Sequence, residues 1–151
     1  MLVRYRIVLG IFIVGLIVSG ITALPLQWEL GVLDGWFGSR AEPGNFISYV
    51  HSGIVETYSR FPFFGYETDW LAFGHFIIAA FFLLPFANPI KYRAILNVGL
   101  IACAGVIILA LICGPIRGIP FFWTLIDCSF GILGAIPLLY CLRLTTKLGA
   151  D

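Results

Sequence analysis

The stretch AILNVGLIACAGVIILALIC, residues 94–113, decides the fold class of this chain. A helix needs about 20 consecutive apolar residues to cross the hydrocarbon core of a bilayer. This stretch supplies them, with Asn97 as its one strongly polar side chain. It is therefore predicted to be a transmembrane helix in which Asn97 makes a hydrogen bond to a neighbouring helix.

Three further stretches have a similar apolar character, at residues 7–26, 70–86 and 119–142. The chain is 60% hydrophobic and 11% charged, with a mean hydropathy of +1.01, well outside the range of soluble globular proteins. We expect an all-α integral membrane protein, a four-transmembrane-helix bundle, with residues 1–151 forming a single membrane domain. The first span is expected to be a retained anchor, since its apolar run is long for a signal peptide.

Positive charges are distributed unevenly between the two sides of the predicted membrane. If the N-terminus is cytoplasmic, the inner side carries Arg4, Arg6, Lys91, Arg93, Arg143 and Lys147, and the outer side carries only Arg40, Arg60 and Arg117. Cytoplasmic loops are enriched in Lys and Arg. We therefore predict a bacterial-type inner (plasma) membrane protein, with both termini cytoplasmic and the long loop, residues 27–69, outside.

The long outer loop is predicted to contain a helix of its own. Apolar side chains recur in it at four-residue spacing: Phe46, Val50, Ile54 and Tyr58. This is the pattern of an amphipathic helix. Such a helix would lie on the outer membrane surface or cap the bundle.

Two polar side chains lie inside the predicted spans, at similar depths. At 1.5 Å per helical residue, His75 lies about 8 Å below Trp70, and Asp127 lies about 6 Å below Trp123. Ionisable residues inside a bilayer are costly and mark either a paired partner or a functional site. His75 and Asp127 are therefore the first candidates for function.

Small residues indicate which helix faces pack together. Gly131 and Gly134 follow Asp127 at helical spacing on the fourth span, and Gly99 and Cys103 share one face of the third. Small side chains let transmembrane helices approach closely. We therefore expect all four helices to pack tightly, with Asp127 facing the bundle interior.

Asp69 and Arg117 flank the same end of the spans, so that Asp69, His75, Arg117 and Asp127 form a predicted polar cluster near the outer face. Three interpretations are open. The charges could pair and hold the helix ends together. They could line a pocket for a small molecule or a lipid head group. Finally, His75 or Asp127 could act as an acid or base.

The leading functional hypothesis is a small membrane protein that binds a small or lipidic ligand at this cluster, or that serves as an accessory or structural membrane subunit. The alternative is a membrane-embedded enzyme that acts on a lipid or quinone-like substrate, with His75 as acid/base. The expected partners are the lipid bilayer, a small-molecule or lipid ligand, and either further copies of the chain or a larger membrane complex.

Several kinds of site are not expected. The four cysteines lie inside apolar runs without a CxxC spacing, so no metal site is predicted. Haem is not expected as a cofactor, because His51, the only histidine besides His75, lies in the outer loop. The few, dispersed charges do not indicate nucleic-acid binding. No nucleophile motif or phosphate-binding loop is present.

Overall fold

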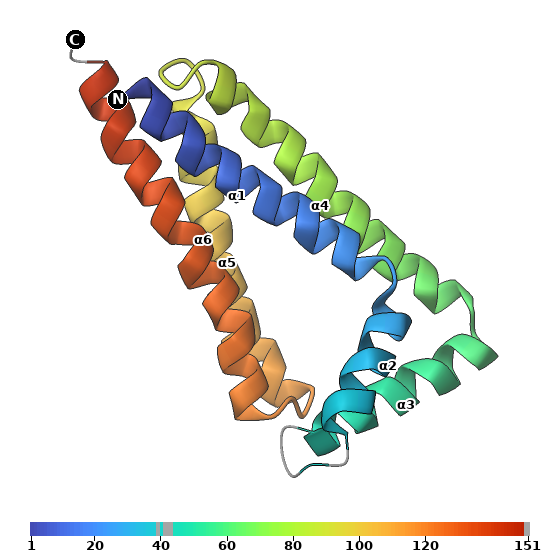
Figure 1. Cartoon of the computed structure of the whole chain (residues 1–151). Coiled ribbons are helices and arrows are strands. Elements are labelled where there is room, and N and C mark those ends of the chain that lie inside the picture. The colour runs from blue at the N-terminus through green and yellow to red at the C-terminus, as the bar shows by residue number, and fades with distance from the viewer. Residues whose placement is uncertain (39, 41–43, 150–151) are drawn as a thin grey trace. The chain divides into compact units, whose positions relative to one another are not determined.

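The structure is a computed structural model that describes residues 1–38, 40 and 44–149. Within these ranges the chain forms six α-helices: α1 (Leu2–Ala23), α2 (Leu26–Phe37), α3 (Gly44–Arg60), α4 (Phe63–Ala87), α5 (Arg93–Ile116) and α6 (Phe121–Leu148) (Figure 1).

Four of these helices, α1, α4, α5 and α6, are long and apolar enough to cross a membrane, with 22, 25, 24 and 28 residues. At 1.5 Å per residue even the shortest is about 33 Å long, and a bilayer core is about 30 Å thick. The prediction of an all-helical chain with four helices that could span a membrane is therefore confirmed, and it suggests a multi-pass membrane protein. A helix does form at the place expected in the long loop, as α3, but its position on the outer membrane surface stays a prediction.

The ends of the spans differ from those expected from hydropathy. α1 ends at Ala23 rather than at residue 26, because Pro25 lacks the N–H group that would continue the helical hydrogen bonding. α4 begins at Phe63, well before the expected start at Trp70, since the aromatic segment that precedes the apolar run is itself helical. Hydropathy locates the apolar part of a helix but not the residues at which the helix begins and ends.

The helix α2 lies inside the predicted loop and was not expected as a separate element. Its apolar residues Leu26, Leu30 and Leu33 recur at the spacing of one helix face, and Leu30 is buried. This face packs against α3, where Ile47 is buried. The two short helices therefore stabilise each other.

The helices belong to two compact units, which are described separately. One unit contains Met1–Gly15 and Ile78–Asp151, and thus the first part of α1, the last part of α4, and all of α5 and α6. The other unit is Leu16–Ile77, and contains the remaining parts of α1 and α4 together with α2 and α3.

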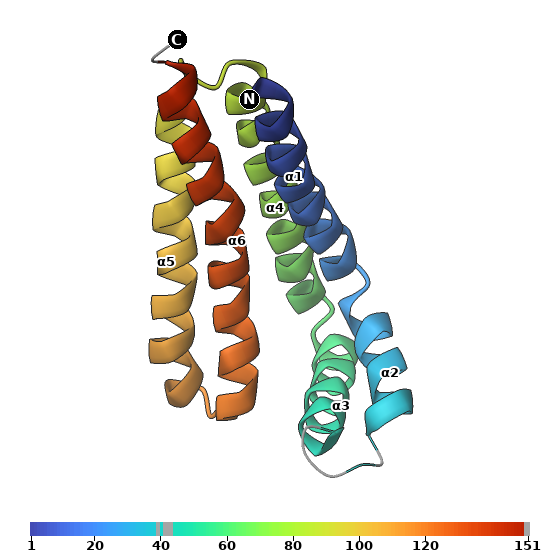
Figure 2. The ribbon, with the colours of Figure 1, turned by 60° about the vertical axis from the view of Figure 1, so that its left-hand side comes forward.

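In the first unit, α5 and α6 lie side by side along their length (Figure 2). A Cβ atom added at Gly131 would lie 2.5 Å from the carbonyl oxygen of Cys103, and one added at Gly134 would lie 3.1 Å from the Cys103 Sγ. A Cβ atom added at Gly99 would lie 2.8 Å from Cδ1 of Leu138. The small residues of α5 and α6 therefore lie where these two helices approach closely.

A buried hydrogen bond joins α1 to α4 in the same unit. The Tyr5 hydroxyl donates to the carbonyl oxygen of Pro85 at 3.0 Å, and the Tyr5 side chain is fully buried. In a continuing helix this carbonyl would accept from the N–H of residue 89, but residue 89 is a proline and has none. Tyr5 therefore donates to a carbonyl that Pro89 cannot serve as a helical partner.

In the second unit, the end of α1 lies close to α4. A Cβ atom at Gly20 would lie 2.7 Å from the ring of Phe76 and 3.0 Å from the carbonyl oxygen of Ala72. The chain then turns at Leu24 and Pro25 into α2. This turn forms one wall of the cavity described next.

Candidate functional site

The candidate site is centred on Asp34 of α2 and His51 of α3. The Nδ1 nitrogen of His51 lies 2.8 Å from Oδ2 of Asp34, and the two side chains are only 25% and 29% exposed. Ser48, one turn before His51 on the same helix face, donates its hydroxyl to the other carboxylate oxygen of Asp34. Both oxygens of Asp34 thus accept a hydrogen bond from α3.

The hydrogen bonds to Asp34 determine which ring nitrogen of His51 carries the proton. The bonds from Ser48 and then from His51 lower the pKa of Asp34 below its ordinary value of 3.8, so the carboxylate is ionised at neutral pH. An ionised carboxylate is only an acceptor. Nδ1 of His51 therefore carries the proton, and Nε2 is the nitrogen left for other partners.

Gly31 of α2 makes room for the imidazole ring. A Cβ atom at this position would lie 3.3 Å from Nε2 of His51 and 3.6 Å from Cε1. This is tighter than an ordinary van der Waals contact. The glycine lets the Nε2–Cε1 edge of the ring lie close to the helix that also carries Asp34.

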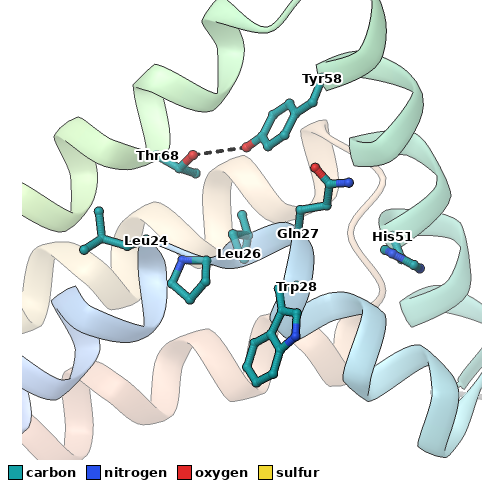
Figure 3. A pocket seen from close by; sticks show the side chains of 8 residues that line it. Leu24, Leu26, Gln27, Trp28, His51, Tyr58 and Thr68 are labelled. Atoms are coloured by element: carbon teal, nitrogen blue, oxygen red, sulfur yellow. Dashed lines mark hydrogen bonds between the residues drawn. The ribbon is translucent and has the colours of Figure 1, made fainter.

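Beside His51 lies a cavity of about 450 Å³, drawn in Figure 3. It is lined by Leu24, Pro25, Leu26, Gln27, Trp28, His51, Tyr58 and Thr68. Its volume is in the range of small-molecule sites, and its walls combine apolar side chains with a few polar groups, as such sites generally do. The described residues that line it include no Lys, Arg, Asp or Glu.

Tyr58 and Thr68 form a second polar part of the cavity wall. The Thr68 hydroxyl donates to the carbonyl oxygen of Gly65 at 2.7 Å, and the Tyr58 oxygen lies 3.1 Å from Thr68 Oγ1 (Figure 3). Thr68 has a single hydroxyl proton, and Gly65 accepts it, so Tyr58 is the donor in the second bond. The ring of Tyr58 also packs on Gly65, where a Cβ atom would lie 3.6 Å away.

Two of the residues predicted from sequence as a polar cluster lie on α4 in the second unit. Asp69 is exposed and borders a shallow depression of about 260 Å³ with Tyr66, Trp70 and Phe73. His75 is partly exposed, and its Nδ1 donates to the carbonyl oxygen of Leu71, one turn earlier, at 2.8 Å. His75 therefore has a backbone partner on its own helix.

The other two residues of the predicted cluster lie in the first unit. Arg117 is the C-cap of α5, where its backbone N–H bonds to the carbonyl oxygen of Cys113. Asp127 is partly buried on α6, one turn before Gly131. Among the residues that the structure describes, no ion pair joins Arg117 to Asp127. The grouping of these two with Asp69 and His75 stays a prediction.

Reasoning from sequence missed the cavity, although a signal for it was present. Ser48, His51 and Tyr58 lie three and seven residues apart, and this spacing places them on one face of the predicted helix. The partner carboxylate, Asp34, lies on a helix that was not expected.

The chain was compared with protein families, curated proteins and solved structures. No family model matches the chain, and no curated protein or solved structure matches it either.

Proposed function

We propose that this multi-pass membrane protein binds a small or lipidic ligand in the cavity between the α1–α2 turn, α3 and α4. One observation carries the proposal: a cavity of about 450 Å³ in which Trp28, His51, Tyr58 and Thr68 converge on one space. A polar group of the ligand would face the histidine, tyrosine and threonine. Its apolar part would lie against Leu24 and Trp28.

The place of the cavity along the chain supports a ligand from the membrane surface. Leu24 and Pro25 directly follow the end of α1, and Thr68 comes just before the apolar run of α4. Because both helices are candidate spans, their ends lie near the head groups. We further propose the orientation deduced from the charges, a bacterial-type inner membrane with both termini cytoplasmic, which places this cavity on the outer side.

The test is to purify the full chain in nanodiscs and identify co-purifying small molecules by mass spectrometry. Trp28→Ala should lose a species that the wild type retains. Trp36→Ala is the matched control, because Trp36 is also an exposed tryptophan of α2 and does not line the cavity. If the wild type carries nothing, or if both variants retain the same species, a role as accessory or structural subunit replaces the binding proposal.

A second candidate function is an enzyme that acts on a lipid or quinone-like substrate, with His51 rather than His75 as acid/base. The observation in its favour is the carboxylate of Asp34 behind the imidazole, because a catalytic histidine is generally oriented by such a group. His75 instead bonds to its own helix backbone. Incubation with a membrane lipid extract tests this: His51→Gln should abolish any product that His75→Gln leaves intact.

The predicted cluster of Asp69, His75, Arg117 and Asp127 is kept as a separate proposal. If these residues together hold a ligand or lock the spans, Asp127→Asn and His75→Gln should have coupled effects on thermal stability or on ligand retention. Strict additivity of the two effects in the double variant would contradict the grouping.

A further inference from the structure

We propose that the ligand of this cavity presents hydroxyl groups from an uncharged head group, because two of the lining side chains, Tyr58 and His51, carry hydrogen-bond acceptors that receive no proton from the described residues. The inference rests on the proposed function and adds the chemical class of the ligand. Glycerol-type and sugar-type head groups share this chemistry.

Tyr58 supplies the first acceptor. Its proton is directed to Thr68 Oγ1, since the Thr68 proton is directed to Gly65. A phenol oxygen that has donated its proton still has a lone pair to offer. A ligand hydroxyl can donate to this oxygen, whereas a ligand carbonyl or ether oxygen cannot.

His51 supplies the second acceptor. Nδ1 donates to Asp34, and Nε2 has no hydrogen-bond partner among the described residues. In a neutral imidazole the nitrogen without the proton is an acceptor. A ligand hydroxyl that reaches this edge of the ring, which lies against Gly31, can donate to the nitrogen.

The other polar side chains that line the cavity, Trp28 and Gln27, are also compatible with a hydroxyl ligand. The Trp28 indole N–H donates, and the Gln27 amide both donates and accepts. A hydroxyl group plays both roles, so it can satisfy these groups as well as Tyr58 and His51. A ligand with acceptors only would leave Tyr58 and His51 unmatched, and unmatched buried polar groups weaken binding.

Charge argues against an ionic head group. No Lys or Arg occurs among the described lining residues, so a phosphate would find no cation. The nearest carboxylate, Asp34, is already bonded at both oxygens, by Ser48 and His51, and is not a lining residue. It would repel an anion and is not placed to neutralise a quaternary ammonium group.

The experiment compares lipids that share one acyl chain, by native mass spectrometry of the full-length protein in detergent. The probes are a 1-monoacylglycerol, its 2,3-di-O-methyl ether, the corresponding lysophosphatidic acid, and the corresponding lysophosphatidylcholine. We expect the monoacylglycerol to bind about tenfold or more tightly than the dimethyl ether, and more tightly than either charged lipid. Equal binding of the ether, or preference for a charged lipid, would overturn the hydroxyl assignment while leaving a ligand site in place.

A matched pair of variants locates the effect in the cavity. Tyr58→Phe removes the acceptor and keeps the ring, so it should reduce the preference for the monoacylglycerol over the ether. Tyr49→Phe changes an exposed tyrosine of the same helix and should leave the preference unchanged. Two outcomes call for a third variant: the two tyrosine variants behave alike, or their thermal midpoints show that only Tyr58→Phe unfolds. In either case, His51→Gln must reduce the preference for the monoacylglycerol over the ether for the inference to stand.

Free glycerol and octyl glucoside distinguish the source of the head group. Binding of glycerol as tightly as monoacylglycerol would support the hydroxyl chemistry and identify a free polyol as the ligand. Tighter binding of the two amphiphiles would support the same chemistry and identify a lipid. Failure of every probe to bind would overturn this inference together with the proposed function.

Discussion

His51 Nδ1 and Asp34 Oδ2 lie 2.8 Å apart and join two helices, α2 and α3. With Ser48 on the second carboxylate oxygen, α3 supplies both donors and α2 supplies the acceptor. The contact therefore does two things at once. It holds the two helices in register, and it directs the imidazole beside the cavity.

The Asp34 carboxylate makes this contact sensitive to acid. Because the folded pKa lies below the ordinary value of 3.8, the stabilisation is fully present above that value and is lost as the pH falls through the lower folded pKa. Asp34→Asn should lower the thermal midpoint at neutral pH and flatten its dependence on acid pH. Thermal unfolding in detergent, from neutral pH to below 3.8, measures both effects.

Glu56→Gln is the control for this experiment. Glu56 pairs with Arg60 at 3.6 Å on the exposed side of α3, where both side chains are more than 70% exposed. Exposed pairs of this kind contribute little, so the variant should follow the wild type at every pH. A midpoint for Asp34→Asn that equals the wild type throughout would show that the His51–Asp34 contact does not stabilise the fold.

Gly31→Ala should weaken ligand binding, because the new methyl group would press on the Nε2 side of His51 at 3.3 Å. Gly35→Ala is a matched control on the same helix, since a Cβ atom there meets nothing within 4 Å. Both changes raise helix propensity, by up to about 1 kcal/mol. Gly35→Ala should therefore gain stability with unchanged affinity, and equal affinities of the two variants would contradict the role of Gly31.

Gly131→Ala should destabilise the α5–α6 pair by about 1–3 kcal/mol. Its Cβ atom would lie 2.5 Å from the backbone oxygen of Cys103, so one helix would have to shift. Gly105→Ala, in the middle of α5, meets nothing within 4 Å and should be tolerated. Thermal unfolding in detergent separates the two, and similar midpoints would show that the helices are not in close contact at Gly131.

Tyr5→Phe should cost about 1–2 kcal/mol, because it leaves the carbonyl of Pro85 without a hydrogen bond in an apolar environment. Tyr140→Phe changes a tyrosine of α6 that is 40% exposed, and it should have a smaller effect. The comparison is again one of thermal midpoints. A loss in Tyr140→Phe as large as that in Tyr5→Phe would indicate a general effect of the hydroxyl group rather than the Pro85 contact.

Reporter fusions test the proposed orientation. Green fluorescent protein fused to the C-terminus should fluoresce, since it folds in the cytoplasm, and alkaline phosphatase at the same place should be inactive. Fused after Arg60, in the long loop, the two reporters should give the opposite result. Active phosphatase at the C-terminus would reverse the orientation and place the cavity on the cytoplasmic side.

The spans could be predicted because their signal is local. A run such as residues 94–113 has to be helical in a bilayer whatever surrounds it, since its backbone groups must bond within the segment. The small-residue faces that carry Gly99 and Gly131 could be predicted for the same reason, because helical spacing alone places residues on one face. The break at Pro25 and the start of α4 at Phe63 lie outside the apolar runs' signal, so the predicted ends of these two helices differ from the observed ones.

The sequence by itself determined that the chain has four helices long and apolar enough to cross a membrane, and that small residues line up along one side of such helices. Only the tertiary structure decided that His51 meets Asp34, and that Tyr58, Thr68 and Trp28 surround one cavity. The physical reason is that hydropathy and helical period describe one helix at a time. A hydrogen bond across α2 and α3 depends on the turn between them and on how two amphipathic faces register, and neither is encoded in a local pattern.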